Sequence, residues 1–210
     1  MTFAREAWPF VLPFGLLAAA LLWLRHPAWA AAAALGGLGT LLFFRVPARE
    51  APTGEGVVVS AASGRVLSVE RLPASEVGDG PYHRIATFLS VFDVHVQRAP
   101  VAGRVVSIAH TPGRKLAAFR AGADRVNERR LMVLDSAGER FGVSQIVGLV
   151  ARRIVTWVGE GDRLDRGQLY GLIKFGSRVD VYVPVEYTVT VQRGDRVVEG
   201  ETVIARREGA

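Results

Sequence analysis

The chain opens with two long uncharged stretches and continues with short apolar runs separated by polar and turn residues. Ala7–Leu24 and Ala28–Phe44 contain no charged side chain, and Arg25-His26-Pro27 lies between them. Each stretch has 17–18 residues, which is near the lower limit for a helix that crosses a bilayer. The pattern predicts an N-terminal helical hairpin, transmembrane or membrane-associated, over residues 1–46, with Pro27 in its turn.

Prolines and glycines within this segment agree with two packed helices. Pro9 and Pro13 lie near the start of the first helix, where proline costs least. Gly36, Gly37 and Gly39 would allow the second helix to approach the first closely.

A secretory signal peptide is the alternative for this segment. Arg5 opens it, and Ala28-Trp29-Ala30 resembles a cleavage site. The second apolar segment, directly after that site, argues against a signal peptide. Arg5, Arg45 and Arg49 outnumber Arg25 in the turn, so the positive-inside rule places both ends, and the domain that follows, on the cytoplasmic side of the cell membrane.

The rest of the chain reads as a linker and a β-rich domain. Residues 47–56 contain Pro47, Pro52, Gly54 and Gly56 and are predicted to be a linker. Residues 57–210 are predicted to form one β-rich domain, all-β or α+β, because short apolar runs alternate with turn residues. Residues 85–97 fit a short helix or a strand, and residues 117–123 a loop. The expected strands are 57–59, 65–69, 104–108, 131–134, 145–150, 179–183 and 188–191.

Two segments repeat the pattern G-D-x-apolar-x-x-G. They are residues 161–168 and 194–201, and both resemble the hairpin repeat of lipoyl and biotinyl carrier domains. Each is expected to form a turn in which the aspartate bonds to local backbone amides. A shorter pair, Ser63-Gly64-Arg65-Val66 and Ala102-Gly103-Arg104-Val105, occurs earlier. We take these repeats as indicators of fold rather than of chemistry.

Composition narrows the possible chemistry. The chain has no cysteine, which excludes disulfides, thiolate catalysis and cysteine metal sites. No histidine pair has the spacing of a zinc site, and neither a Walker A sequence nor Gly-x-Ser-x-Gly occurs, so no metal is expected. The net charge of +6 suits anionic partners. Basic clusters are short and lack interleaved aromatic residues, so nucleic acid is not an expected partner.

One histidine has a carboxylate close by. Asp93 and His95 are two residues apart, so they point to one face if the segment is a strand. A carboxylate beside an imidazole fixes its tautomer and raises its basicity. An ordinary surface pair is the alternative.

Gly176-Ser177 is the second candidate for chemistry. The glycine has no Cβ, so its carbonyl is open to attack, and the serine hydroxyl is the nearest nucleophile. Taken alone, the dipeptide reads as an ordinary turn.

Taken together, the motifs of residues 43–190 resemble the phosphatidylserine decarboxylase family, in its short prokaryotic branch. They occur in order along the chain: 43–47 (FFRVP), 88–90 (FLS), 92–100 (FDVHVQRAP), 127–129 (NER), 145–148 (QIVG), 151–155 (ARRIV) and 171–181 (GLIKFGSRVDV).

The resemblance implies a self-cleaving, pyruvoyl-dependent lyase. Members of that family cut themselves at a Gly-Ser bond. Carried over to this chain, Ser177 attacks Gly176, and the chain becomes two pieces, residues 1–176 and residues 177–210, that stay associated. Ser177 becomes a pyruvoyl group, which forms a Schiff base with phosphatidylserine and releases CO₂ to give phosphatidylethanolamine. His95 matches the family's proton donor, and we expect Asp93 to orient it.

The chain departs from the family pattern at Ser63, Val91 and Gln97, and only the first of these departures matters for the chemistry. Relatives commonly carry aspartate where this chain has Ser63, which leaves open the source of serine activation; Asp93 and Asp180 are the candidates to replace it. The candidates for the lipid phosphate are Arg45, Arg98, Arg152 and Arg153. The alternatives are a membrane-anchored adaptor that stays uncut and a decarboxylase of another serine lipid. A homodimer is compatible with the sequence.

Overall fold

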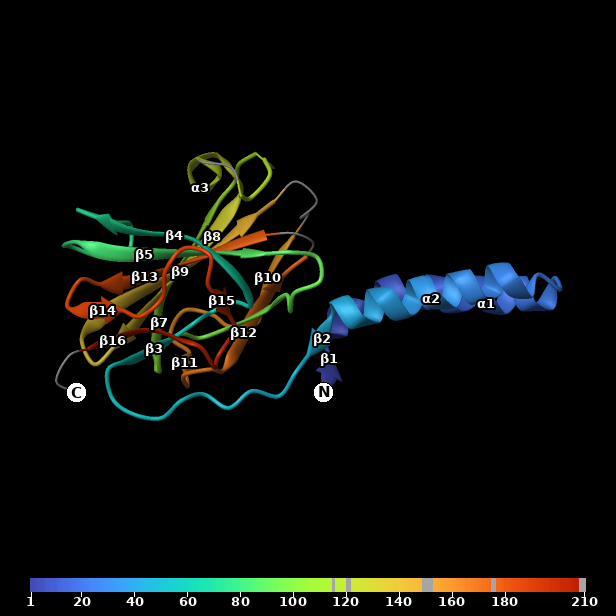
Figure 1. The fold of residues 1–210 in the computed structure, drawn as a ribbon, viewed down its shortest axis with the longest axis horizontal. Helices are drawn as coiled ribbons and strands as arrows, with labels where there is room; N and C mark the ends of the chain where they lie inside the picture. Colours follow the sequence, from blue (N-terminus) through green and yellow to red (C-terminus); the bar gives the residue numbers. More distant parts are fainter. Residues whose placement is uncertain (115, 120–121, 149–152, 175–176, 208–210) are drawn as a thin grey trace. The chain divides into compact units, whose positions relative to one another are not determined.

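The computed structural model describes residues 1–114, 116–119, 122–148, 153–174 and 177–207 (Figure 1). The chain divides into two compact units, Met1–Ala48 and Arg49–Ala210. Each unit is treated by itself.

The first unit is a helical hairpin. Helix α1 (Trp8–Trp23) follows a 3₁₀ turn, η1 (Arg5–Ala7), and α2 (Pro27–Phe43) runs back along it. Arg25 has a φ of 61° in the turn between them. Short strands β1 (Thr2–Phe3) and β2 (Arg45–Val46) pair at the base of the hairpin.

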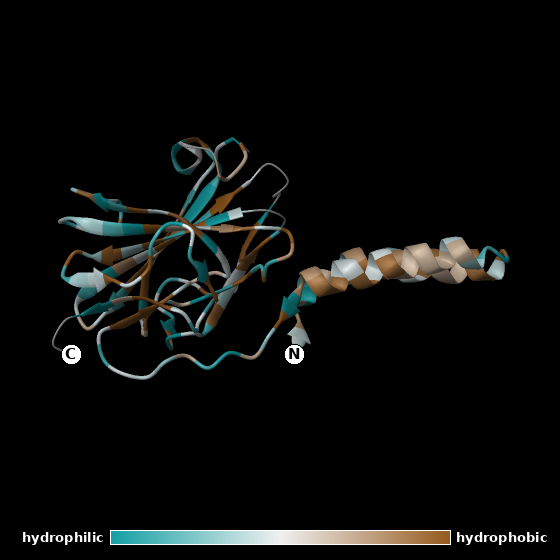
Figure 2. Cartoon of the chain, in the orientation of Figure 1, coloured by the Kyte–Doolittle hydropathy of each residue, from teal (hydrophilic) through white to brown (hydrophobic). Residues whose placement is uncertain are grey.

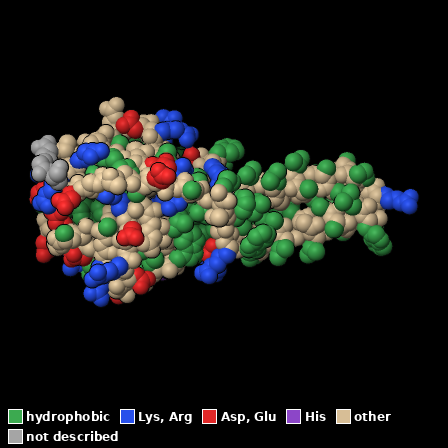
Figure 3. All heavy atoms as spheres, turned by 90° about the horizontal axis from the view of Figure 1, so that it is seen from below, with side chains coloured by type: hydrophobic (Ala, Val, Ile, Leu, Met, Phe, Trp, Pro, Cys, Tyr) green, Lys and Arg blue, Asp and Glu red, His purple; other side chains and the backbone are tan. Residues whose placement is uncertain are grey.

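Close packing in the hairpin depends on two of the three glycines. A Cβ at Gly36 or Gly37 would lie 2.8 and 3.1 Å from atoms of Phe14, whereas a Cβ at Gly39 would meet nothing within 4 Å. Most residues of the two helices are apolar (Figure 2), and in the face shown in Figure 3 hydrophobic side chains lie on the outside of the hairpin. The segment Arg5–Trp23 is long and apolar enough to cross a membrane, and α2 is a shorter apolar helix. This composition is compatible with membrane association.

The second unit is an α+β domain built almost wholly of antiparallel strands. Its main sheet has the order β11-β7-β8-β9-β13-β5-β4-β15 and curls into a half-barrel, and two three-stranded sheets have the orders β10-β12-β6 and β14-β16-β3. The strands are β3 (Val57–Val59), β4 (Gly64–Leu72), β5 (Tyr82–Leu89), β6 (Val96–Arg98), β7 (Gly103–Thr111), β8 (Arg129–Ser136), β9 (Glu139–Val147), β10 (Ile154–Thr156), β11 (Arg163–Leu164), β12 (Leu169–Ile173), β13 (Ser177–Pro184), β14 (Tyr187–Val189), β15 (Arg196–Val197) and β16 (Val203–Arg207).

Most expected strands lie within observed ones, with four corrections. Residues 85–97 are neither one helix nor one strand, because β5 ends at Leu89 and a turn precedes β6. Of the strand expected at 145–150, residues 145–147 are the end of the longer β9, and residues 149–150 lie outside the described residues. Of the strand expected at 188–191, only residues 188–189 belong to β14. Of the loop expected at 117–123, residues 120–121 lie outside the described residues, and Ala123 begins a one-turn helix, α3 (Ala123–Val126).

The domain is an internal duplication with approximate two-fold symmetry. Strands β3, β4, β5, β13, β14, β15 and β16 form one half, and β6, β7, β8, β9, β10, β11 and β12 form the other. The order of the main sheet is symmetric about the β9–β13 pair, and each half contributes one equivalent three-stranded sheet. The β4–β5 bulge at Val66/Ser68 has its counterpart in the β7–β8 bulge at Val105/Ser107.

Hydrogen bonds follow the same symmetry. The amide of Val66 donates to Asp195 O at 2.9 Å, and the amide of Val105 donates to Asp162 O at 2.8 Å. The early repeat at residues 63–66 therefore pairs with the later G-D turn at 194–201, and the second copies pair in the same way. In both G-D turns the aspartate carboxylate accepts the expected hydrogen bond from a backbone amide, at 2.8 Å for Asp162 and 2.9 Å for Asp195.

The alternation of β13 separates two environments. Val179, Val181 and Val183 pack in the main core inside the curled sheet, whereas Tyr182 packs against a smaller cluster on the other side. Side chains alternate between faces along a strand. Ser177 therefore faces the main core, and Asp180 faces away from it.

Candidate active site

Ser177 is the first residue of a strand that is paired on both sides. It lies opposite Leu89 of β5 and Val147 of β9. Its side chain is fully buried, and among the described residues nothing lies within hydrogen-bonding distance of its Oγ. A buried hydroxyl without a partner is costly in a folded protein, so it marks a position with a role other than stability. Gly176, the other half of the predicted cleavage site, lies outside the described residues.

His95 is buried at the start of β6, and the expectation that it shares a strand face with Asp93 is wrong. Asp93 lies in the turn before β6. Its Oδ2 accepts bonds from the Ser90 amide and hydroxyl at 2.8 and 2.7 Å, and its Oδ1 lies 3.3 Å from an Arg196 nitrogen. The carboxylate thus stabilises the turn.

Asp93 still contacts the imidazole, but through its backbone. The Nδ1 of His95 lies 2.9 Å from the Asp93 carbonyl oxygen. Such a contact favours the tautomer with a proton on Nδ1, which then donates to the carbonyl. The sequence pattern pointed to the right pair of residues for the wrong reason, because a two-residue spacing indicates a shared face only within a strand.

A pair of buried amides joins the His95 segment to the main sheet. The side-chain nitrogen of Gln97 donates to the His95 carbonyl at 2.8 Å, and that of Gln145 donates to the Gln97 side-chain oxygen at 2.8 Å. Both glutamines are buried. Gln145 lies opposite Val179, two residues beyond Ser177. These hydrogen bonds therefore fix the position of the His95 backbone relative to the start of β13.

Asp180 lies on the outer face of β13. Arg178 donates to both of its oxygens at 2.6 and 2.7 Å, and Arg84 lies 4.0 Å away. Burial raises the pKa of the Asp180 carboxyl, and the two arginines oppose that shift. Because Ser177 faces inward, Asp180 is badly placed to receive its proton.

A second buried carboxylate, Glu199, was not found from the sequence. It lies in the turn after β15, has no exposed surface, and is hydrogen-bonded to the Ser63 hydroxyl. Arg49 donates to it at 2.9 and 3.4 Å. The only sequence signal was indirect: Ser63 marked a departure from the family pattern, but no periodicity connects it with a residue so far along the chain.

The candidate phosphate ligands occupy different environments. Arg98 is buried, donates to the Gly167 carbonyl at 2.8 Å, and has its pKa lowered by burial, opposed by Glu199. Arg153 is exposed beside β10, and its carbonyl accepts a bond from the Lys174 amide at 3.2 Å. Arg45 belongs to the first unit and donates to Leu42 O at 2.8 Å. Arg152 lies outside the described residues.

Comparisons with known proteins point to one family. Residues 39–205 match the pattern of the family described as "Phosphatidylserine decarboxylase". A phosphatidylserine decarboxylase proenzyme from Symbiobacterium thermophilum is 47% identical over 206 residues, which cover 97% of this chain and 94% of that protein.

Two further relatives carry the same name. One, from Saccharopolyspora erythraea, is 47% identical over 204 residues, with 94% of this chain and 85% of the relative covered. The other, from Beijerinckia indica, is 46% identical over 209 residues, with 97% and 88% covered. The buried residues Ser177 and His95 thus belong to a chain whose relatives form a class of self-processing lyases. The chain belongs to the phosphatidylserine decarboxylase family.

Proposed function

We propose that this chain is a proenzyme that cuts itself before Ser177 and then decarboxylates phosphatidylserine at the new terminus. As a member of its family it is a pyruvoyl-dependent carboxy-lyase. The observation that carries the residue assignment is the buried Oγ of Ser177 at the start of β13, which has no hydrogen-bond partner among the described residues. A buried serine hydroxyl that is not engaged elsewhere is available to react with the carbonyl immediately before it.

The cleavage step balances within the chain. Attack by Ser177 Oγ on the Gly176 carbonyl carbon forms a C–O bond and breaks the C–N bond, and the hydroxyl proton ends on the freed amine. Loss of the Ser177 Cα proton then expels the Gly176 carboxylate. Water converts the remaining enamine into a ketone, with release of ammonia. The products are chains 1–176 and 177–210.

The residues around Ser177 then serve the second reaction. The pyruvoyl carbonyl supplies the electron sink that decarboxylation of an amino acid requires. His95 is our candidate to protonate the carbon left after CO₂ departs. The contact of its Nδ1 with the Asp93 carbonyl leaves Nε2 as the nitrogen that exchanges the proton. The amide of Ile173, four residues before Ser177, donates to the His95 carbonyl, which supports a short path between the two groups.

The two products are expected to stay together. Strand β13 pairs with β5 and β9 along its length, so the small chain contributes a central strand of the main sheet. Loss of one peptide bond leaves those backbone hydrogen bonds intact.

The substrate lipid and the apolar hairpin together favour a membrane location. We propose that residues 1–46 anchor the enzyme in the cell membrane, with the catalytic domain in the cytoplasm and residues 47–56 as linker. Arg153, exposed beside the segment that leads to Ser177, is our candidate for the lipid phosphate.

Substitution Ser177→Ala should leave one uncut chain, because it removes the nucleophile. Intact mass spectrometry of the purified protein checks this, with wild-type protein as the control that gives two chains and a pyruvoyl terminus. A cut Ser177→Ala protein would contradict the assignment.

Substitution His95→Asn should lower the decarboxylation rate per pyruvoyl group by roughly 10²–10⁴-fold, the usual contribution of a general acid. The measurement is CO₂ release in a single turnover by material that has been cut. A variant that turns over at the wild-type rate would remove His95 from the mechanism.

Substitution Arg153→Ala should raise KM for phosphatidylserine by about tenfold, the effect of losing one charge-assisted bond, with little change in kcat. Arg71→Ala is the matched control, since Arg71 is exposed near the end of β4 opposite to the Ser177 end. Equal KM values for the two variants would argue against the phosphate contact.

The absence of cysteine makes topology easy to test. In intact cells a membrane-impermeant maleimide should label His26→Cys in the hairpin turn. It should label Arg193→Cys in the exposed β14–β15 turn only after the cells are opened. Labelling of Arg193→Cys in intact cells, or recovery of the chain in the soluble fraction, would contradict the proposed location.

A further inference from the structure

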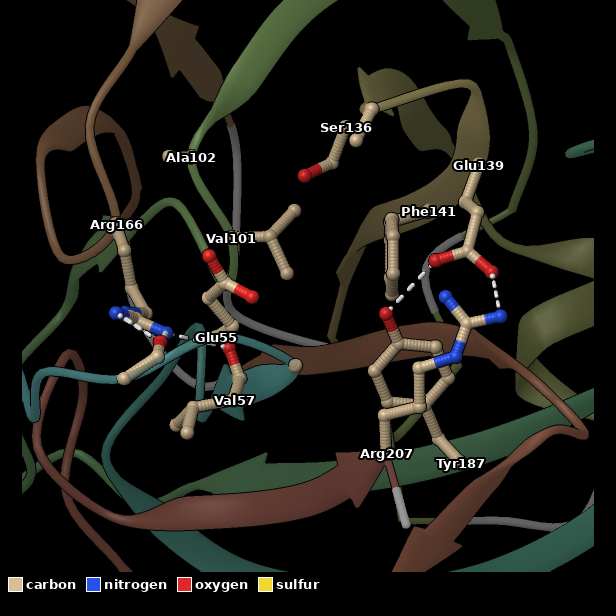
Figure 4. A pocket seen from close by; sticks show the side chains of 13 residues that line it. Glu55, Val57, Val101, Ala102, Ser136, Glu139, Phe141, Arg166, Tyr187 and Arg207 are labelled. Atoms are coloured by element: carbon tan, nitrogen blue, oxygen red, sulfur yellow. Dashed lines mark hydrogen bonds and ion pairs between the residues drawn. The ribbon is translucent and has the colours of Figure 1, made fainter. Parts of the chain in front are cut away.

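An open pocket lies between the two halves of the domain, lined by residues of β3, β14 and β16 from one half and of β9 from the other. Its volume is about 420 Å³, and it is lined by Ala102, Glu139, Phe141, Arg166, Tyr187 and others (Figure 4). Tyr187 donates to Glu139 at 2.9 Å, and Arg207 pairs with the same carboxylate at 3.1 Å. The internal symmetry relates this pocket to the surroundings of Ser177.

Equivalent positions follow from shared hydrogen bonds and pairing. Gly56 corresponds to His95, because their carbonyls accept the amides of Arg207 and Ile173, the equivalent last positions of the β14–β16 and β10–β12 ladders. Glu139 corresponds to Ser177, because the β8–β9 pair Ser136/Glu139 matches the β5–β13 pair Leu89/Ser177.

Two further equivalences concern the G-D turns. The amides of Gly200 and Gly167 each donate at 2.8 Å, to Ser60 O and Ala99 O, so the residues before them correspond: Glu199 and Arg166. Gly64 pairs with Val197 as Gly103 pairs with Leu164, so Ser63 corresponds to Ala102. Glu139, Gly56, Arg166 and Ala102 all line the pocket. By the same symmetry, their counterparts Ser177, His95, Glu199 and Ser63 surround one equivalent space between the two halves.

Neighbouring strands support the same arrangement. A Cβ on Gly64 would clash with the Phe88 carbonyl oxygen, so β4 lies close against β5 at that point. Leu89, the next residue, lies opposite Ser177. Ser63 and Ser177 are thus at the same end of two strands that flank β5.

Glu199 is the carboxylate best placed to serve this space. Of the described acidic residues in the second unit, only Asp180 and Glu199 are buried. Asp180 lies on the outer face and is bound by Arg178. Asp93 is largely buried, but its oxygens contact Ser90 and Arg196. The Ser63 hydroxyl donates a hydrogen bond to the Glu199 carboxylate and accepts one from the Glu199 backbone amide at 3.2 Å.

We propose that Glu199, acting through the Ser63 hydroxyl, is the positioning carboxylate for self-cleavage. In the uncut chain the described residues offer Ser177 Oγ no hydrogen bond, so the relay requires the Ser177 side chain to turn toward Ser63. Ser63 Oγ then accepts the proton of Ser177 Oγ as it attacks, and passes its own proton to Glu199. As the C–N bond breaks, the relay returns a proton to the freed amine of residue 177, so no net charge is left. Arg49 forms an ion pair with Glu199 at 2.9 Å in the uncut chain. This inference rests on the proposed cleavage at Ser177 and assigns its activation.

The test is the rate of conversion of newly made full-length chain into two chains, followed on denaturing gels. Glu199→Gln keeps the shape but removes the charge and should slow conversion by about 10²-fold or more, the usual contribution of a proton acceptor. Ser63→Ala places at this site the residue found at the equivalent position 102 and should slow it comparably. Wild-type rates for either variant would overturn the proposal.

A rescue variant separates a relay from mere packing. Ser63→Asp combined with Glu199→Ala moves the carboxylate to the other side of the same bond and should recover conversion to within about tenfold of wild type. Thermal unfolding in the uncut Ser177→Ala background establishes that each variant is folded. A folded double variant that stays as slow as Glu199→Gln would assign Glu199 to packing and overturn the relay.

The matched control is Glu201→Gln. Glu201 also pairs with Arg49, at 3.5 Å, but its side chain is 38% exposed. The Glu201→Gln variant should therefore convert at the wild-type rate. A loss equal to that of Glu199→Gln would overturn the proposal, because it would make Arg49, not the relay, the sensitive group. Ser177→Ala keeps the two hypotheses apart. If it is cut, the proposed function fails; if only wild type and Glu199→Gln are cut, at equal rates, the relay alone fails.

Discussion

The pairing of β13 on both of its edges is the constraint on which the rest of the structure depends. The strand lies between β5 and β9 in the middle of the main sheet. Register in such a strand is strongly fixed, because a slip of one residue would exchange core-facing valines with Arg178 and Asp180. The same register places the Ser177 hydroxyl in the core, where no residue that the structure describes forms a hydrogen bond with it.

Buried charge is divided between the two faces of the main sheet. On the outer face Asp180 pairs with Arg178, and on the inner side Glu199 pairs with Arg49. Buried ion pairs seldom add net stability, because desolvation offsets their attraction, yet removal of one partner is strongly destabilising. The outer pair sits where no reacting atom is expected and acts as a structural lock. The inner pair adjoins a hydroxyl in the reaction space, which is why we assign it to chemistry.

The sequence predicted the local elements better than their combination. The helical hairpin, most strands and the G-D turns were readable, because apolar periodicity and Gly-Asp turns are local signals. The turn before His95 was misread as strand, since Val94 and Val96 alternate with polar residues while Asp93 is used to bond Ser90. Glu199 could not be found at all, because its partners Arg49 and Ser63 are brought to it only by the fold. The structural role of the repeated G-D turns, which is to pair with β4 and β7 in the two halves of the domain, follows only from the fold.

The duplication also explains where the chain can tolerate a break. Strands β6–β12 form one complete half, inserted between the β3–β5 and β13–β16 portions of the other. The proposed scission before Ser177 would fall at the passage from the inserted half back to its host, not within a hairpin of either. The C-terminal piece, if separated, would be a complementing fragment whose return is guided by the two sheet edges of β5 and β9. Maturation at this point would change the chemistry of one residue while the architecture persists.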